Sequence, residues 1–217
     1  MDRAHHLGQP IRSLSMDILL PPTGTGPGVV VAHAWWGLNQ AIRDYGAALA
    51  KQGFVVGLPD LFDGKIADTI EGAEALASTD RSPNAGERLR SAIAELAAHD
   101  AVSGDKVAAV GFSFSGFHLF GLAGADDVPL NRLVIHYATR QVGAQHVPML
   151  VHFAENDPFE STEDMLEVTK ALAADGAPNA AYTYPSTRHW FVEPDRPEYD
   201  ADEAKLAWDR TLAFLRG

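Results

Sequence analysis

Three residues of this chain have the side-chain types needed to transfer an acyl group: Ser113, Asp157 and His189. A serine hydroxyl is almost wholly protonated at neutral pH, so it needs a base in hydrogen-bond contact before it attacks a carbonyl carbon. A histidine can accept that proton and return it to the leaving group. A carboxylate can fix the imidazole tautomer and stabilise the transient imidazolium. We therefore expect Ser113 as nucleophile, His189 as base and Asp157 as the residue that orients the base.

Ser113 lies in the segment 107–116, VAAVGFSFSG, which is typical of a nucleophile elbow. In such an elbow a strand turns sharply into a helix and lifts one hydroxyl from a strained backbone. Small residues are needed two positions before and after the nucleophile, and Gly111 and Ser115 are small. The common pattern is G-x-S-x-G, so Ser115 is a departure from it. The alternative interpretation is an ordinary buried strand followed by a Gly-Ser turn.

Other side chains compete for the roles of base and carboxylate. Of nine histidines, only His189 falls in a late loop after a strand-like run, and three lie within apolar runs where we expect core residues: His33, His136 and His152. Asp157 competes with Glu155 and Glu160. The proline directly after Asp157 predicts a fixed turn and favours this aspartate. A metal site built by the three strand histidines is a further alternative, but no ligand-spacing motif is present and we expect no metal.

The same loops supply candidates for binding the substrate. We expect the backbone N–H groups of Trp35 and Phe114 to form an oxyanion hole, in which each donor is typically worth ~3 kcal/mol. Aromatic side chains near these positions could line an apolar pocket, with Trp36 and Trp190 as the substrate-binding candidates. A second pair, Arg81 and Arg188, could hold an anionic substrate group, although a solvated arginine is the alternative for both.

Strand-like and helix-like segments alternate along the chain. Apolar or alternating runs predict strands over residues 12–20, 28–34, 54–58, 107–111, 132–137, 148–154 and 180–184. Apolar residues at helical spacing predict helices over residues 40–52, 69–78, 86–99, 114–123, 163–174 and 201–215. This alternation predicts an α/β fold: a mostly parallel sheet, with residues 12–20 as an edge strand and helices on both faces, in one domain over 1–217. Ligands of such sheets bind beyond the carboxyl ends of the strands, where the three candidate residues fall.

Composition narrows the class of protein. The 217 residues carry a net charge of −12 and include no cysteine, so disulfides, thiolate metal sites and a cysteine nucleophile are excluded. An acidic surface argues against nucleic acid and anionic membranes as partners. No signal peptide and no run of ~20 apolar residues is apparent. We expect a soluble, cytoplasmic protein acting on a small molecule, and leave open whether it is a monomer or a homodimer.

Several stretches together resemble the dienelactone hydrolase family of the α/β-hydrolase fold. They are HAWWGLN at 33–39, GFVVGLPDLFDG at 53–64, the elbow at 111–116, NDP at 156–158 and HWF at 189–191. The order Ser113, Asp157, His189 is also the order of the triad in α/β-hydrolases. The resemblance implies hydrolysis of esters or lactones through an acyl-enzyme, without a cofactor.

Two positions depart from that family. Its members usually have cysteine where this chain has Ser113 and glutamate where it has Ala34. The two changes are consistent with each other, because a serine relies on the His–Asp pair and gains little from a carboxylate that governs a thiol. We therefore predict a serine carboxylesterase or lactonase, and dienelactone itself becomes a doubtful substrate. The alternatives are a catalytically inactive binding protein on the same fold, and acyl transfer to an acceptor other than water.

Overall fold

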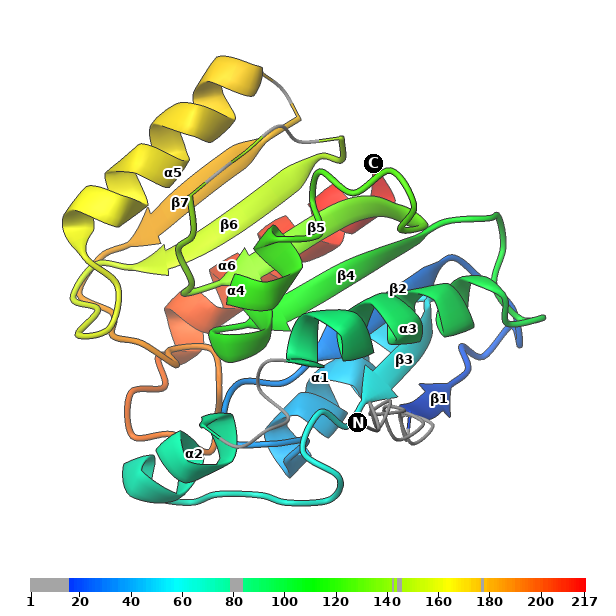
Figure 1. The fold of residues 1–217 in the computed structure, drawn as a ribbon, viewed down its shortest axis with the longest axis horizontal. Helices are drawn as coiled ribbons and strands as arrows, with labels where there is room; N and C mark the ends of the chain where they lie inside the picture. The colour runs from blue at the N-terminus through cyan, green and yellow to red at the C-terminus, as the bar shows by residue number, and fades with distance from the viewer. Residues whose placement is uncertain (1–15, 79–83, 142, 144–145, 177) are drawn as a thin grey trace, which may run out of the picture.

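The computed structural model describes residues 16–78, 84–141, 143, 146–176 and 178–217, and Figure 1 shows their arrangement. In this part of the chain, seven strands form one sheet. Their order across the sheet is β1 (Met16–Leu19), β3 (Val55–Pro59), β2 (Gly28–Ala32), β4 (Val107–Phe112), β5 (Leu130–His136), β6 (Met149–Ala154) and β7 (Ala180–Tyr184). All neighbouring strands are parallel except β1, which pairs antiparallel with β3 at the edge.

Helices cover both faces of the sheet (Figure 1). Because strand side chains alternate, Val29 and Val31 of β2 belong to one hydrophobic cluster while Val30 and Ala32 belong to the other. The first cluster includes residues of α1 (Gln40–Lys51) and α6 (Ala201–Arg216), and the second includes residues of α3 (Ala85–Ala97), α4 (Phe114–Phe120) and α5 (Thr162–Asp175). The short helix α2 (Ile70–Ala77) lies near the edge at which the parallel strands end.

This architecture confirms the predicted α/β fold, and the differences lie at element ends. The strand predicted over 28–34 ends at Ala32, because the chain then turns and the His33 side chain bonds to the Ala34 carbonyl. The helix predicted over 114–123 ends at Phe120, and the next residues form tighter turns. The predicted first strand is seen over Met16–Leu19, and its residues 12–15 lie outside the described residues.

The sheet gathers distant parts of the sequence at one edge. The strands β2, β4, β5, β6 and β7 run in the same direction, so the loops that follow them meet beyond their carboxyl ends (Figure 1). The elbow follows β4, near the middle of the sheet, while the segments at 155–160 and 185–191 follow β6 and β7. Among the described helices, none has the length and apolar character that crossing a bilayer requires.

Candidate active site

Ser113 occupies the sharp turn between β4 and α4. Its φ of +46° lies in a region that non-glycine residues rarely adopt. The turn is held by two backbone hydrogen bonds: Ser113 N–H donates to the His136 carbonyl (2.9 Å), and the Ser113 carbonyl accepts from Phe117 N–H (2.9 Å). A side chain on Gly111 would have its Cβ 2.9 Å from the backbone of Gly116. The strand and the helix can therefore approach this closely only because residue 111 has no side chain.

Ser115, the departure from the common elbow pattern, has a structural role. Its buried hydroxyl accepts a hydrogen bond from Phe112 N–H (2.9 Å) and donates to the Ala32 carbonyl (2.6 Å). The expectation that a small residue is needed two positions after Ser113 is thus incomplete, because the glycine that closely approaches Gly111 is Gly116. The hydroxyl at 115 ties the elbow to the end of β2, a contact that glycine could not make.

The side chains of Ser113, His189 and Asp157 form a continuous hydrogen-bonded relay. Nε2 of His189 lies 2.9 Å from the Ser113 hydroxyl oxygen, and Nδ1 lies 2.7 Å from a carboxylate oxygen of Asp157. The side chains of His189 and Asp157 are only 2% and 1% exposed, so water competes little for these contacts. This geometry selects the imidazole tautomer that is protonated at Nδ1, which leaves Nε2 free to accept a proton from Ser113.

A tight turn after β6 fixes the carboxylate of Asp157. While Oδ2 faces His189, Oδ1 accepts hydrogen bonds from the backbone N–H groups of Phe159 (2.9 Å) and Glu160 (3.1 Å). Glu160 is itself fixed, because its carboxylate accepts from the N–H (3.0 Å) and hydroxyl of Thr139 after β5. Burial raises the pKa of Glu160 to about 7. The turn that carries Asp157 is therefore anchored to two neighbouring strands.

The loop that carries His189 is tied to the same turn. Thr187 is buried, and its hydroxyl donates to the Tyr184 carbonyl at the end of β7 (2.8 Å). Its carbonyl accepts from Asn156 N–H (2.9 Å), directly beside Asp157. The base and the carboxylate are thus held by one network, although they lie 32 residues apart.

The sheet register relates the two segments that carry the expected oxyanion donors. Ala32 of β2 is paired with Gly111 of β4. Trp35 lies three residues after Ala32, and Phe114 lies three residues after Gly111. Phe114 is the first residue of α4, and the N–H groups of a first helical turn have no acceptor within the helix. An oxyanion hole formed by Trp35 and Phe114 stays a prediction.

Comparison with known proteins gives the family. The sequence profile of the dienelactone hydrolase family matches residues 17–217. This chain belongs to the dienelactone hydrolase family. It is 28% identical over 208 residues to protein usf of Aquifex pyrophilus, with 90% of each chain covered. It is 28% identical over 212 residues to a carboxymethylenebutenolidase of a Pseudomonas species, covering 91% of this chain and 87% of that protein.

A solved structure gives the same family. It is that of a dienelactone hydrolase-like promiscuous phosphotriesterase from metagenomic libraries. The TM-score is 0.80 at 25% identity, with 94% of this chain and 92% of that chain covered. As a member of the dienelactone hydrolase family, the protein is a hydrolase of the carboxylic ester and lactone class.

Aromatic side chains surround the relay of this dienelactone hydrolase family member. Trp190 follows the histidine and packs edge-on against it, with ring centroids 5.0 Å apart. Trp190 also contacts Trp35 and Trp36 at 6.0 and 5.0 Å. Phe159, which sequence reasoning did not single out, lies 4.9 Å from His189 and 5.5 Å from Trp35, and it is 47% exposed. These rings pack together beside His189 and form an aromatic wall there.

The predicted arginine contacts have different outcomes. Arg188 is exposed and directly precedes His189, so a contact with substrate stays a prediction. Arg81 lies outside the described residues. A different arginine contacts the aromatic wall: the guanidinium of Arg196 lies over the ring of Trp36 at 4.3 Å from its centroid. Trp36 is the most buried of these rings, with only 2% of its surface exposed, and direct contact with substrate stays a prediction for it as well.

The three histidines of the apolar sequence runs lie in the core, as predicted, His33 just beyond the end of β2. Nδ1 of His33 contacts the Ala34 carbonyl (2.6 Å), and its Nε2 accepts from Leu61 N–H (3.0 Å). Burial lowers the pKa of His33 to about 4 and that of His136 to about 3, so both are neutral at physiological pH. His152 contacts the Tyr184 hydroxyl and Thr211. Among the described residues, no cluster of three or more His, Asp or Glu side chains is arranged to hold a metal ion.

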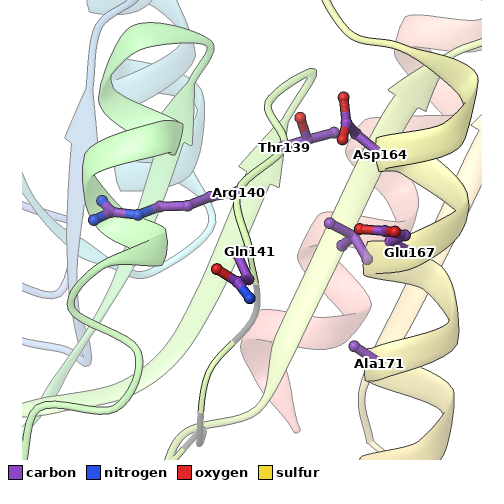
Figure 2. Close-up of a pocket in the computed structure, with 7 residues that line it drawn as sticks. Thr139, Arg140, Gln141, Asp164, Glu167 and Ala171 are labelled. Atoms are coloured by element: carbon purple, nitrogen blue, oxygen red, sulfur yellow. The ribbon is translucent and has the colours of Figure 1, made fainter.

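A separate cavity of about 390 Å³ lies between α5 and the segment that follows β5. Figure 2 shows Asp164, Glu167 and Ala171 on the α5 side and Gln141 opposite them, whereas the Arg140 side chain points away toward α4. Arg140 there donates to the Phe117 carbonyl (3.1 Å) and lies over the Phe117 ring. The cavity lining includes none of the three relay residues, so this hollow is apart from the candidate active site.

Proposed function

We propose that the protein is a cofactor-independent serine hydrolase that cleaves carboxylic esters or lactones through an acyl-enzyme. The observation that carries the proposal is the relay from Asp157 through His189 to Ser113, with contacts of 2.7 and 2.9 Å. Each contact matches the distance required for nucleophile activation and for orientation of the base. The strained elbow supports it further, since strain in the backbone is concentrated at functional sites.

In the first half-reaction, Ser113 attacks the substrate carbonyl while its proton passes to Nε2 of His189. The tetrahedral oxyanion is stabilised by the N–H groups of Trp35 and Phe114, and the imidazolium is stabilised by Asp157. Collapse breaks the carbon–oxygen bond, and His189 gives its proton to the departing alkoxide. An ester releases an alcohol, whereas a lactone opens and its hydroxyl stays attached to the acyl chain.

In the second half-reaction, water replaces the leaving group. His189 takes a proton from the water, the resulting hydroxide attacks the acyl carbon, and the carboxylic acid is released as the proton returns to Ser113. The substitution of Cys by Ser fits this route, because a hydroxyl depends on a well-placed base more than a thiol does. The buried methyl group of Ala34 leaves no second carboxylate at the position where the family usually has glutamate.

A fluorophosphonate probe tests the proposal directly. It should label the protein stoichiometrically at Ser113, and labelling should be abolished in Ser113→Ala and strongly slowed in His189→Ala. Nitrophenyl esters and small lactones should be hydrolysed by the same preparation and blocked by the label. Absence of labelling and of hydrolysis in a folded protein would instead support the inactive binding protein. Products formed with added alcohols or amines would distinguish acyl transfer from hydrolysis.

A further inference from the structure

A tyrosine that the relay does not include packs against His189. Tyr137 directly follows β5, is fully buried, and has its ring centroid 4.7 Å from that of His189. Its backbone has a φ of +38°, and its N–H donates to the His152 carbonyl at 2.7 Å. A tyrosine in this uncommon conformation is a costly way to fill a core position, which indicates a role for its ring or its hydroxyl.

The hydroxyl of Tyr137 donates to a carboxyl group that is equally buried. Oε1 of Glu193 accepts this hydrogen bond at 2.5 Å, and Glu193 is only 1% exposed. Within the part of the chain that the structure describes, the second oxygen of Glu193 has no hydrogen-bond partner. A carboxyl group buried with so little compensation destabilises a fold, so packing alone does not explain it.

The position of the pair matters because His189 becomes positively charged during the proposed reaction. An imidazolium near the face of an aromatic ring, within about 6 Å of its centroid, is attracted to the ring. A phenol that donates a hydrogen bond to a carboxyl group has a more electron-rich ring, since hydrogen-bonded groups in a low dielectric polarise one another. Asp157 contacts Nδ1 of the imidazole, whereas the Tyr137 ring lies 4.7 Å from the imidazole, centroid to centroid, at an interplanar angle of 53°.

We propose that Tyr137 and Glu193 form a buried positioning pair that holds the His189 ring in the relay and stabilises its protonated form. The proposal rests on the proposed function and deepens it, because it concerns how the base is supported. Both residues act indirectly, Tyr137 through His189 and Glu193 through Tyr137. The contacts pass in sequence from Glu193 to Tyr137 to His189.

The charges around Glu193 set the pH at which the pair changes. The pKa of Glu193 is raised to about 8, first by burial and also by the negative charges of Asp195 and Glu198, while the Tyr137 hydrogen bond and Arg196 oppose the rise. Burial and Glu193 also raise the pKa of Tyr137, so the phenol keeps its proton. Ionisation of Glu193 above neutral pH therefore places a negative charge at the far end of the Tyr137 ring, where it strengthens the support of the imidazolium.

The test is kcat and KM of the full chain with a soluble nitrophenyl acetate from pH 6 to 9.5. The wild type should show one rise in kcat at lower pH and a second rise near pH 8, where Glu193 ionises. Glu193→Gln keeps an acceptor for Tyr137 but cannot ionise. It should lose the second rise, with kcat about three- to tenfold lower at pH 9 and KM unchanged. Tyr137→Phe keeps the ring and should lose the second rise as well.

The matched control is Tyr184→Phe, which removes a buried phenol hydroxyl that contacts His152 instead of the pair. It should keep the wild-type pH profile. A Glu193→Gln or Tyr137→Phe enzyme that keeps the second rise and the wild-type kcat would overturn the proposal. If one variant does not fold, as judged by circular dichroism, the other decides. Fluorophosphonate labelling of Ser113 in the wild type separates this failure from failure of the proposed function.

Discussion

The hydroxyl of Ser115 donates a hydrogen bond to the carbonyl oxygen of Ala32 at 2.6 Å and thereby joins the turn after β4 to the last residue of β2. The same oxygen accepts from Phe112 N–H, so one buried group satisfies two backbone partners. Because β2 leads into the segment that carries Trp35, this hydroxyl also links the two segments that carry the expected oxyanion donors.

Replacing Ser115 by alanine should therefore destabilise the protein and slow the reaction. Two buried backbone groups would lose their partner, which typically costs about 1–3 kcal/mol for each group left unsatisfied. Chemical denaturation measures the stability, and kcat measures the effect on the donors. The control is Ser91→Ala, since Ser91 is exposed and bonds only to a carbonyl of its own helix. Equal stability of Ser115→Ala and Ser91→Ala would contradict the assigned role.

Replacing Ser113 by alanine should abolish the chemistry while preserving the fold. We expect ester hydrolysis to fall by on the order of 10⁴-fold or more, because removing the nucleophile of such a relay leaves only binding and oxyanion stabilisation. The measurement is kcat/KM with a nitrophenyl ester, with exposed Ser103→Ala as the control. A loss below tenfold would mean that the nucleophile has been assigned to the wrong residue.

Replacing Asp157 by asparagine should cost activity by reversing a hydrogen bond. If the amide oxygen keeps the two backbone N–H donors of the turn, the amide nitrogen faces Nδ1 of His189 and favours the wrong tautomer. We expect kcat to fall by about 10³- to 10⁴-fold with little change in the melting temperature. The exposed Asp126→Asn is the control, and an active Asp157→Asn enzyme would show that another carboxylate orients the base.

Replacing Glu193 by glutamine should alter how stability depends on pH. Burial raises the pKa of Glu193 to about 8 in the folded state, so between its unfolded value and pH 8 the folded protein holds a proton that the unfolded chain has released. Wild-type stability should therefore fall across that window. The advantage of Glu193→Gln should grow with pH, by at most about 5 kcal/mol. Denaturation at pH 5 and pH 9 measures this.

The control for that experiment is Glu95→Gln, which changes the same side-chain type at an exposed position of α3. It should leave the pH dependence of stability unchanged. A Glu193→Gln protein whose advantage over the wild type is the same at both pH values would show that Glu193 is ionised throughout.

The relay residues could be predicted because each lies in a turn or loop that follows a strand recognisable from the sequence. In a parallel sheet, such positions meet at one edge whatever their separation in the sequence. The general fold was predictable for the same reason. The strand end at Ala32 was not, since it depends on a bond that the His33 side chain makes after the chain has turned.

The residues that support the site could not be found in this way. Tyr137 ends an apolar run of the sequence and has the signature of an ordinary core residue, while its partner Glu193 lies 56 residues away. Phe159 is a single aromatic residue in a polar loop. Ser115 looked like a departure that weakens the elbow motif, because its hydrogen bond to Ala32 depends on how closely β2 and β4 approach each other. Each role arises from tertiary contacts that no local pattern encodes.

The backbone of Ser113 has a consequence for how such a protein can change through evolution. A φ of +46° is easily adopted by glycine and costs other residues roughly 1–3 kcal/mol. A glycine at this position would therefore be expected to make the chain more resistant to unfolding while removing the attacking oxygen. If the free energy of unfolding alone were selected, glycine would be favoured at this position. The Ser113 hydroxyl is therefore retained at a cost in stability.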